Sequence, residues 1–209
     1  EEEPASALVD QCVDAGHLRA VLPPAKDDAF IVAVPTQVRH ADAHAPDLSY
    51  VDSAGRSIAP VLKKGDLIIL ESTSPVGTTE RLARLLAAER PDLKFPQDAG
   101  EDADVCLAYC PERIIPGQMP KELIENDRII GGMTSRCAER AASLYQRFVR
   151  GVCHLTTDRT AEMVKLTENS FRDVNIAFAN ELSMICADQG VDVWKVIEFA
   201  NRHPRVSIL

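Results

Sequence analysis

Three common features are missing from this 209-residue sequence: an uninterrupted apolar run near twenty residues, a CxxC pair of cysteines, and a glycine-rich GxGxxG turn. Without such a run there is no candidate membrane-spanning helix, and nothing at the start is typical of a signal peptide. Without CxxC spacing, a structural zinc site is not expected. Without GxGxxG, the sequence holds no complete dinucleotide-binding unit. We therefore expect a soluble, cytoplasmic protein with no membrane partner and no metal.

The charge balance and the cysteines narrow the class of protein further. A formal net charge of -9 argues against a nucleic-acid partner, because binding to phosphate backbones usually needs a basic face. An anionic small molecule is still allowed, since a few local basic side chains can hold it. The chain is too large to need disulfide staples, so several of its six scattered cysteines are interpreted as reduced core residues. The six are Cys12, Cys106, Cys110, Cys137, Cys153 and Cys186.

Short apolar runs alternate with helical patterns up to about residue 156. This alternation predicts an α/β domain over residues 1–156, with a parallel sheet and right-handed crossovers. Asp47 is a plausible N-cap for a helix that runs to Lys63, and Thr134 caps another that runs to about Val149. The acidic stretch 91–104 is predicted to be a mobile loop. The predicted strands cover residues 28–35, 67–71, 105–109, 128–132 and 151–155.

From residue 157 to 209 the sequence is helical throughout, and one long helix dominates it. Residues 159–190 contain no proline, and the first glycine, Gly190, suits a left-handed C-cap. Such a helix would be roughly 45 Å long at about 1.5 Å per residue. We expect a spine between domains or between subunits, with a polar row on a second side. Its apolar stripe comprises Val164, Phe171, Phe178, Leu182 and Ile185.

Three unusual turns follow three of the predicted strands, at 34–36, 72–78 and 110–112. Ligands of open parallel sheets bind beyond the carboxyl ends of the strands, where these turns would lie together. The Ser/Thr-rich turn at 72–78 leads into a helix, so its backbone N–H groups could hold a phosphate or ribose. Each turn alone is more simply a strand end with an N-cap, but three on one edge favour a site. Cys110 has no adjacent histidine and is interpreted as structural.

Several polar side chains are candidates for chemistry, each with a structural alternative. Glu112 could be a general base or part of a surface salt bridge. Lys165 and Asn169, one helical turn apart, could stabilise an oxyanion, or belong to a solvated face on which Glu168 pairs with Arg172. The basic segment 201–205 could capture an anion or cap a helix.

Six motifs, taken in order and spacing, resemble the UDP-sugar 6-dehydrogenases of the UDP-glucose/GDP-mannose dehydrogenase superfamily. Within it they are most similar to the members that act on UDP-N-acetyl-D-mannosamine. The resemblance implies a partial NAD-binding Rossmann domain, then a central helical domain that forms a homodimer through the spine helix. The motifs are VAVPT, ESTSPVGTTE, AYCPERIIPG, NDRIIGG, TAEMVKLTENSFRDVNIAFANELSMICADQG and ANRHPRVSIL.

The family reaction oxidises the sugar C6 alcohol to a carboxylate with two NAD+, through a cysteine thiohemiacetal and thioester. By resemblance, Lys165 stabilises oxyanions with Asn169 as its companion, Thr73 helps to hold the catalytic water, and Glu112 serves the hydrolytic half. The implied cofactor contacts are Val34, Pro35, Thr36, Ser72 and Thr73. The implied substrate contacts are Glu112, Arg113, Lys165, Asn169, Arg172 and Arg205.

Two motifs of the family pattern are absent from this sequence. The glycine-rich turn would precede residue 1, the loop with the nucleophilic cysteine would follow Leu209, and none of the six cysteines takes that place. We therefore expect a piece of a longer protein that is inactive alone. The alternatives are a UDP-glucose or UDP-N-acetylglucosamine 6-dehydrogenase, or a catalytically inert dimerisation module.

Overall fold

The structure is a computed structural model that describes residues 5–22, 24–39, 45–114 and 119–209. It divides into two compact units. Unit 1 extends to Met163, and unit 2 comprises Val164 to Leu209. The predicted domain boundary near residue 156 stays a prediction.

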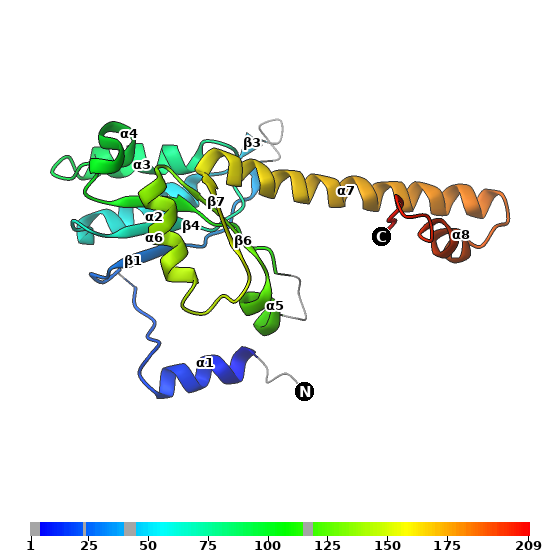
Figure 1. The fold of residues 1–209 in the computed structure, drawn as a ribbon, viewed down its shortest axis with the longest axis horizontal. Coiled ribbons are helices and arrows are strands. Elements are labelled where there is room, and N and C mark those ends of the chain that lie inside the picture. The colour runs from blue at the N-terminus through cyan, green and yellow to red at the C-terminus, as the bar shows by residue number, and fades with distance from the viewer. Residues whose placement is uncertain (1–4, 23, 40–44, 115–118) are drawn as a thin grey trace. The chain divides into compact units, whose positions relative to one another are not determined.

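Unit 1 is built on a five-stranded sheet with the order β1-β4-β5-β6-β7 (Figure 1). β1 pairs with β4 and β4 with β5 in parallel, β5 pairs with β6 antiparallel, and β6 pairs with β7 in parallel. All five predicted strands are present with slightly different ends. They are β1 (Ala29–Val32), β4 (Leu67–Leu70), β5 (Cys106–Tyr109), β6 (Arg128–Gly132) and β7 (Cys153–Thr157).

Alternating residues of β4 and β5 enter two separate cores, which gives unit 1 three layers. Ile68 and Leu70 pack in a cluster with residues of α2 (Ser49–Ile58) and α3 (Thr78–Glu89). Leu67 and Ile69 pack in a second cluster with residues of α6 (Ser135–Tyr145). Both central strands are buried throughout, which explains why their sequences are continuous apolar runs rather than alternating ones.

The antiparallel pairing of β5 with β6 differs from the fully parallel sheet that the sequence predicts. Between these strands the described chain contains only the seven-residue helix α5 (Met119–Glu125), which is about 10 Å long. Parallel neighbours need a crossover connection that carries the chain back along the sheet. The chain instead turns at the carboxyl end of β5 and begins β6 there. Arg128, the first residue of β6, therefore lies at the same edge as the turn after β5.

Most predicted helices are present, with two differences in the connections. The helix predicted over 47–63 ends earlier because Pro60 lies in a 3₁₀ turn, η1 (Ala59–Val61), and Asp47 accepts the amide of Ser49 at 2.9 Å. The segment 91–104, predicted as a mobile loop, contains two short helices and buries Phe95. The remaining elements of unit 1 are α1 (Ala5–Asp14), β2 (Val38–Arg39), β3 (Ala45–Pro46), α4 (Pro96–Ala99) and η2 (Gly100–Asp102).

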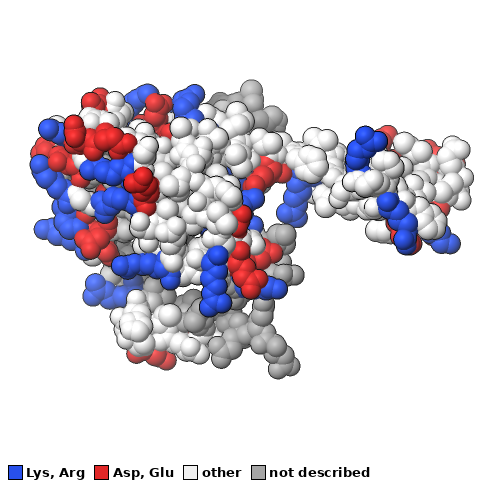
Figure 2. All heavy atoms as spheres, viewed as in Figure 1, with Lys and Arg blue, Asp and Glu red and all other residues white. Residues whose placement is uncertain are grey.

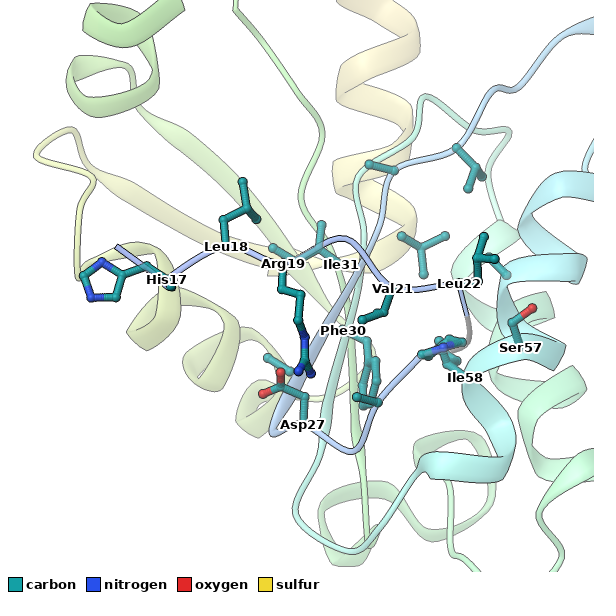
Figure 3. A pocket seen from close by; sticks show the side chains of 18 residues that line it. His17, Leu18, Arg19, Val21, Leu22, Asp27, Phe30, Ile31, Ser57 and Ile58 are labelled. Atoms are coloured by element: carbon teal, nitrogen blue, oxygen red, sulfur yellow. The ribbon is translucent and has the colours of Figure 1, made fainter. Parts of the chain in front are cut away.

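Among the described strands, β1 forms one edge of the sheet, and a cavity of about 810 Å³ lies against it. Side chains of β1 and of the segment before it, among them Phe30 and Val21, line this cavity (Figure 3). Ile31 is half exposed there, although it belongs to an apolar strand. The edge of β1 is therefore both apolar and open to pairing.

The predicted spine helix is present as α7 (Asp158–Asp188), which begins in unit 1 and continues through unit 2. Gly190 ends it with φ +66°, as predicted. α8 (Val193–Ala200) follows, and Asp192 caps it by accepting the amide of Trp194 at 3.0 Å. No helix among the described residues is long and apolar enough to cross a membrane.

The first turn of α7 is fixed to the start of α3 by one buried carboxylate. Glu162 has no solvent exposure, and its two oxygens accept the backbone N–H of Gly77 at 2.6 Å and of Thr79 at 2.8 Å. The Thr79 hydroxyl donates to the same carboxylate at 2.7 Å. Gly77, the N-cap of α3, has no side chain that could cap the helix. Glu162 supplies the cap from 85 residues away and places its negative charge at the positive helix end.

We expect Glu162→Gln to destabilise unit 1 by about 2 kcal/mol. The amide NH₂ of the glutamine would face a backbone N–H donor at a buried position, where the N–H would lose its acceptor. Glu181→Gln, on the exposed part of α7, should change stability by less than about 0.5 kcal/mol. Urea unfolding of both variants measures the difference. Equal unfolding midpoints for the two variants would contradict the role of Glu162.

Candidate functional site

Three turns follow the carboxyl ends of β1, β4 and β5, which are adjacent parallel strands. They comprise residues 33–36, 71–77 and 110–114. Because the strands run in the same direction, these turns share one edge of the sheet, as the sequence predicts. This edge is called the rim below.

The first two turns are joined by their hydroxyl groups. The Ser72 Oγ accepts the backbone N–H of Val34 at 2.7 Å and lies 2.7 Å from the Val34 carbonyl, to which it donates. The Thr36 hydroxyl donates to the carbonyl of Thr73 at 2.6 Å. The structure thus brings together four of the five predicted cofactor contacts, and Pro35 lies exposed between Val34 and Thr36.

The start of α3 differs from the sequence-based expectation. The turn at 72–78 was expected to offer free backbone N–H groups to a phosphate or ribose. The N–H groups of Gly77 and Thr79 instead donate to Glu162. A carboxylate from the chain itself occupies the position of the predicted anion, so this helix end is not available to a phosphate. The sequence alone does not predict this contact, because a glutamate within a helical pattern is usually solvated.

Glu112 lies in the third turn with its carboxylate folded back on the chain. Its Oε1 accepts the backbone N–H of Arg113 at 2.6 Å and of Ile114 at 2.7 Å. Its Oε2 lies 3.9 Å from Nη1 of Arg128, and the side chain is 46% exposed. Arg113 donates from Nη1 to the carbonyl of Asp127 at 3.0 Å, which fastens the turn to the start of β6.

A buried polar group under the rim was not found from the sequence. The Tyr145 hydroxyl donates to Oε1 of Glu71 at 2.6 Å, and the Arg128 guanidinium lies 5.5 Å from the centre of the Tyr145 ring. Burial raises the pKa of Glu71, while the Tyr145 hydrogen bond and the charge of Arg128 act in the opposite direction. Burial also raises the pKa of Tyr145, so its hydroxyl stays protonated and donates. Nothing in the local sequence distinguishes these residues from ordinary strand and helix positions.

Cys110 is fully buried at the end of β5. Burial raises the pKa of its thiol to about 12, so the thiol stays protonated near neutral pH. A protonated, inaccessible thiol is not a nucleophile. The interpretation of Cys110 as structural is confirmed.

The remaining candidates belong to unit 2. Lys165, Asn169 and Arg172 lie along one side of α7 at helical spacing. Arg205 lines a cavity of about 570 Å³ beside the Phe171 side chain. Thr73 and Glu112 belong to unit 1, so the predicted convergence of these residues with Lys165 and Asn169 stays a prediction.

The segment that carries Arg205 is attached to α7 within unit 2. The Asn175 side-chain amide donates to the carbonyl of Ser207 at 2.8 Å, and its Oδ1 accepts the N–H of Leu209 at 3.3 Å. Asn201 holds the same segment through the N–H of Ile208 at 2.7 Å. These contacts hold the residues just after Arg205 against the helices of unit 2.

Both parts of the chain match domains of one known protein family. Residues 1–149 match the NAD binding domain of the UDP-glucose/GDP-mannose dehydrogenase family, and residues 159–209 match its central domain. The UDP-N-acetyl-D-mannosamine dehydrogenase of Escherichia coli K12 is 63% identical over 98% of this chain and 48% of its own length. An NDP-N-acetyl-D-galactosaminuronic acid dehydrogenase of Ralstonia nicotianae is 61% identical over 97% of this chain and 47% of its own length.

A solved structure of a protein with a similar name also resembles this chain. The UDP-N-acetyl-mannosamine dehydrogenase of Staphylococcus aureus is 42% identical and superimposes with a TM-score of 0.86 over 100% of this chain and 49% of its own. The chain therefore spans about half the length of the curated relatives it matches.

We expect Ser72→Ala to lower the free energy of unfolding by about 1 to 2 kcal/mol, because the N–H of Val34 loses its acceptor in a half-buried position. Ser143→Ala, which removes an exposed hydroxyl bonded to the preceding helical turn, should change it by less than about 0.5 kcal/mol. Urea unfolding compares the two. If Ser72→Ala is as stable as Ser143→Ala, the hydroxyl does not hold the two turns together.

Proposed function

The chain belongs to the UDP-glucose/GDP-mannose dehydrogenase family, and we propose that the whole protein oxidises UDP-N-acetyl-D-mannosamine at C6 to UDP-N-acetyl-D-mannosaminuronate. The observation that carries this proposal is the 63% identity to a relative named for that substrate, over 98% of this chain. The 61% identical relative named for a different sugar makes the choice of sugar the point to test.

The overall reaction converts one C6 alcohol, one water and two NAD+ into one carboxylate, two NADH and three protons. NAD+, when bound, accepts one hydride in each of the two oxidations. A cysteine thiolate that we expect outside this chain adds to the aldehyde and becomes a thioester after the second oxidation. Water then attacks the thioester carbon, the C–S bond breaks, and the thiolate is restored.

The rim supports a cofactor site. We assign Val34, Pro35, Thr36, Ser72 and Thr73 to NAD contacts, because two of their turns are joined by hydrogen bonds beyond the carboxyl ends of parallel strands. Glu162 fills the start of α3, so the diphosphate is assigned to a glycine-rich turn upstream. The open edge of β1 would pair with a strand of that upstream unit.

The chemical roles follow from charge and from position on the elements. Lys165 and Asn169 present an ammonium and an amide on one side of α7, which suits stabilisation of oxyanions at C6. Thr73 and Glu112 lie on rim turns of unit 1, which suits positioning and deprotonation of the hydrolytic water. Arg113, Arg172 and Arg205 are assigned to the anionic substrate.

The exposed apolar side of the spine supports a homodimer. Phe171 and Phe178 are 69% and 55% exposed, and they lie seven residues apart on one side of α7. Uncharged side chains predominate on the visible side of unit 2, while charges of both signs intermingle over unit 1 (Figure 2). An apolar helix side of this kind is typical of a helix that packs against a partner. We assign the protein to the cytoplasm, where its six free cysteines would stay reduced.

The proposal is tested by assaying the full-length protein with NAD+ and each of three substrates: UDP-N-acetyl-D-mannosamine, UDP-glucose and UDP-N-acetylglucosamine. We expect two NADH per molecule of the first substrate and slower oxidation of the others. A faster reaction with either other sugar would replace the proposed substrate. The absence of NADH with all three, in a protein that forms a stable dimer, would support the inert dimerisation module instead.

We expect Lys165→Ala in the full-length protein to lower kcat by about 10²-fold or more with little change in KM. The reason is that a charge that stabilises an oxyanion acts in the transition state rather than on the bound substrate. Steady-state kinetics at saturating NAD+ measures both parameters. An unchanged kcat would remove Lys165 from catalysis.

We expect the double variant Phe171→Asp, Phe178→Asp to sediment as a monomer at concentrations where the unaltered protein is a dimer, because buried carboxylates would separate the two apolar faces. Asn180→Asp is the matched control, since it adds a carboxylate on the opposite side of α7. Analytical ultracentrifugation distinguishes the species. A dimeric double variant would place the interface elsewhere.

A further inference from the structure

Arg128 has the largest side chain among the fully buried residues that the structure describes, with 2% exposure. Like any arginine, it stays positively charged near neutral pH. A buried cation is costly unless anions and hydrogen-bond acceptors compensate it. The groups that compensate the buried charge of Arg128 therefore indicate its role. Among the described residues, its Nε has no hydrogen-bond partner, so compensation comes through the two terminal nitrogens and the ring beneath.

The guanidinium contacts three groups from different elements. Nη2 donates to the carbonyl of Leu123 at 3.2 Å, and the carbon of the guanidinium lies 5.5 Å from the centre of the Tyr145 ring. Nη1 lies 3.9 Å from Oε2 of Glu112. The first two contacts fix the guanidinium in place within unit 1, and the third places its charge beside a carboxylate of the rim.

The antiparallel pairing of β5 with β6 accounts for this contact. Ala108 pairs with Gly132 and Tyr109 with Gly131. The same register, continued beyond the paired residues, brings Arg128 opposite Glu112. A parallel β6 would have placed Arg128 at the other end of the sheet.

The same buried group also reaches the turn after β4. Tyr145, which lies under the guanidinium, donates its hydroxyl to Glu71 at 2.6 Å, and Glu71 directly precedes Ser72. The positive charge of Arg128 acts on Glu71 as well. The charge of one buried cation therefore acts on two carboxylates, on the turns that carry Thr73 and Glu112.

The two oxygens of Glu112 have different surroundings. Oε1 accepts two backbone N–H groups of its own turn, while Oε2 faces the guanidinium. The guanidinium, 3.9 Å from Oε2, attracts this oxygen and so favours one direction of the carboxylate.

We propose that Arg128 is a positioning residue for Glu112, which it orients for the hydrolysis of the thioester. The inference rests on the proposed function, since the role of Glu112 does. In this step the water oxygen bonds to the thioester carbon, its proton passes to Glu112, and the sulfur leaves as thiolate. Arg128 touches neither the water nor the substrate and acts through the direction of the carboxylate.

The test uses the full-length protein and four variants: Arg128→Met, Arg128→Lys, Glu112→Gln and the double variant Arg128→Met, Glu112→Gln. Arg90→Met is the matched control, because Arg90 also binds backbone carbonyls, those of Ala59 and Leu62, but at the other end of the sheet. Stopped-flow absorbance of NADH separates the first turnover from the steady state.

For Arg128→Met we expect a first turnover that still yields two NADH per site, followed by a steady-state rate about 10²-fold below that of the unaltered protein. Arg128→Lys should recover part of that rate, because it restores the charge without the planar guanidinium. The double variant should be no slower than Glu112→Gln, since both changes act on one group. Arg90→Met should keep the unaltered steady-state rate.

Three results would overturn the proposal: a first turnover slowed as much as the steady state, losses that multiply in the double variant, or equal rates for Arg128→Met and Arg90→Met. An inactive unaltered protein would instead overturn the proposed function, and the hydrolytic role of Arg128 with it.

A second measurement is independent of activity. Amide hydrogen exchange over residues 110–114 should be faster in Arg128→Met and Arg128→Lys than in the unaltered protein, while exchange in β4 stays unchanged. Unchanged exchange over 110–114 would show that Arg128 does not hold Glu112.

Discussion

The hydrogen bonds from Gly77 and Thr79 to the Glu162 carboxylate are the contacts on which the rest of unit 1 depends. They join the first turn of the spine helix to the start of α3, which itself follows directly from the rim turn of β4. A carboxylate removed from water in this way is stable only where hydrogen bonds and a favourable helix end replace its hydration. Glu162 meets both conditions, because two backbone amides and one hydroxyl donate to it at the start of α3.

Buried polar groups gather at this rim, which supports the site proposed there. Asp158, at the beginning of α7, is buried, and its Oδ2 has no hydrogen-bond partner in the part of the chain that the structure describes. Burial raises the pKa of its carboxyl. Glu71, Tyr145 and Arg128 lie beneath the neighbouring turns. A fold optimised for stability alone would bury apolar side chains here, because buried ion pairs contribute little net stability. The rim holds these charges in fixed directions, which is what the proposed role of Glu112 in proton transfer would require.

Much of the architecture could be predicted from the sequence, because the strands and the spine obey simple patterns. The buried strands are continuous apolar runs, Thr134 caps α6, and Gly190 ends α7, all as predicted. The direction of β6 could not be predicted, since it depends on whether the connection after β5 carries the chain back along the sheet. Glu162 and Arg128 were missed for a related reason. Gly77 and Thr79 lie 85 and 83 residues from Glu162, and the groups around Arg128 come from separate elements. A charged residue in a helix or at a strand end is usually solvated.

A buried carboxylate from α7 replaces the missing cap of α3. Amide hydrogen exchange at Gly77 and Thr79, followed by NMR, is the sharpest test of this cap, because the first amides of a helix exchange quickly when only water accepts them. We expect both amides to exchange as slowly as those of β4 and β5. Exchange of both at the rate of exposed amides would show that Glu162 does not cap α3.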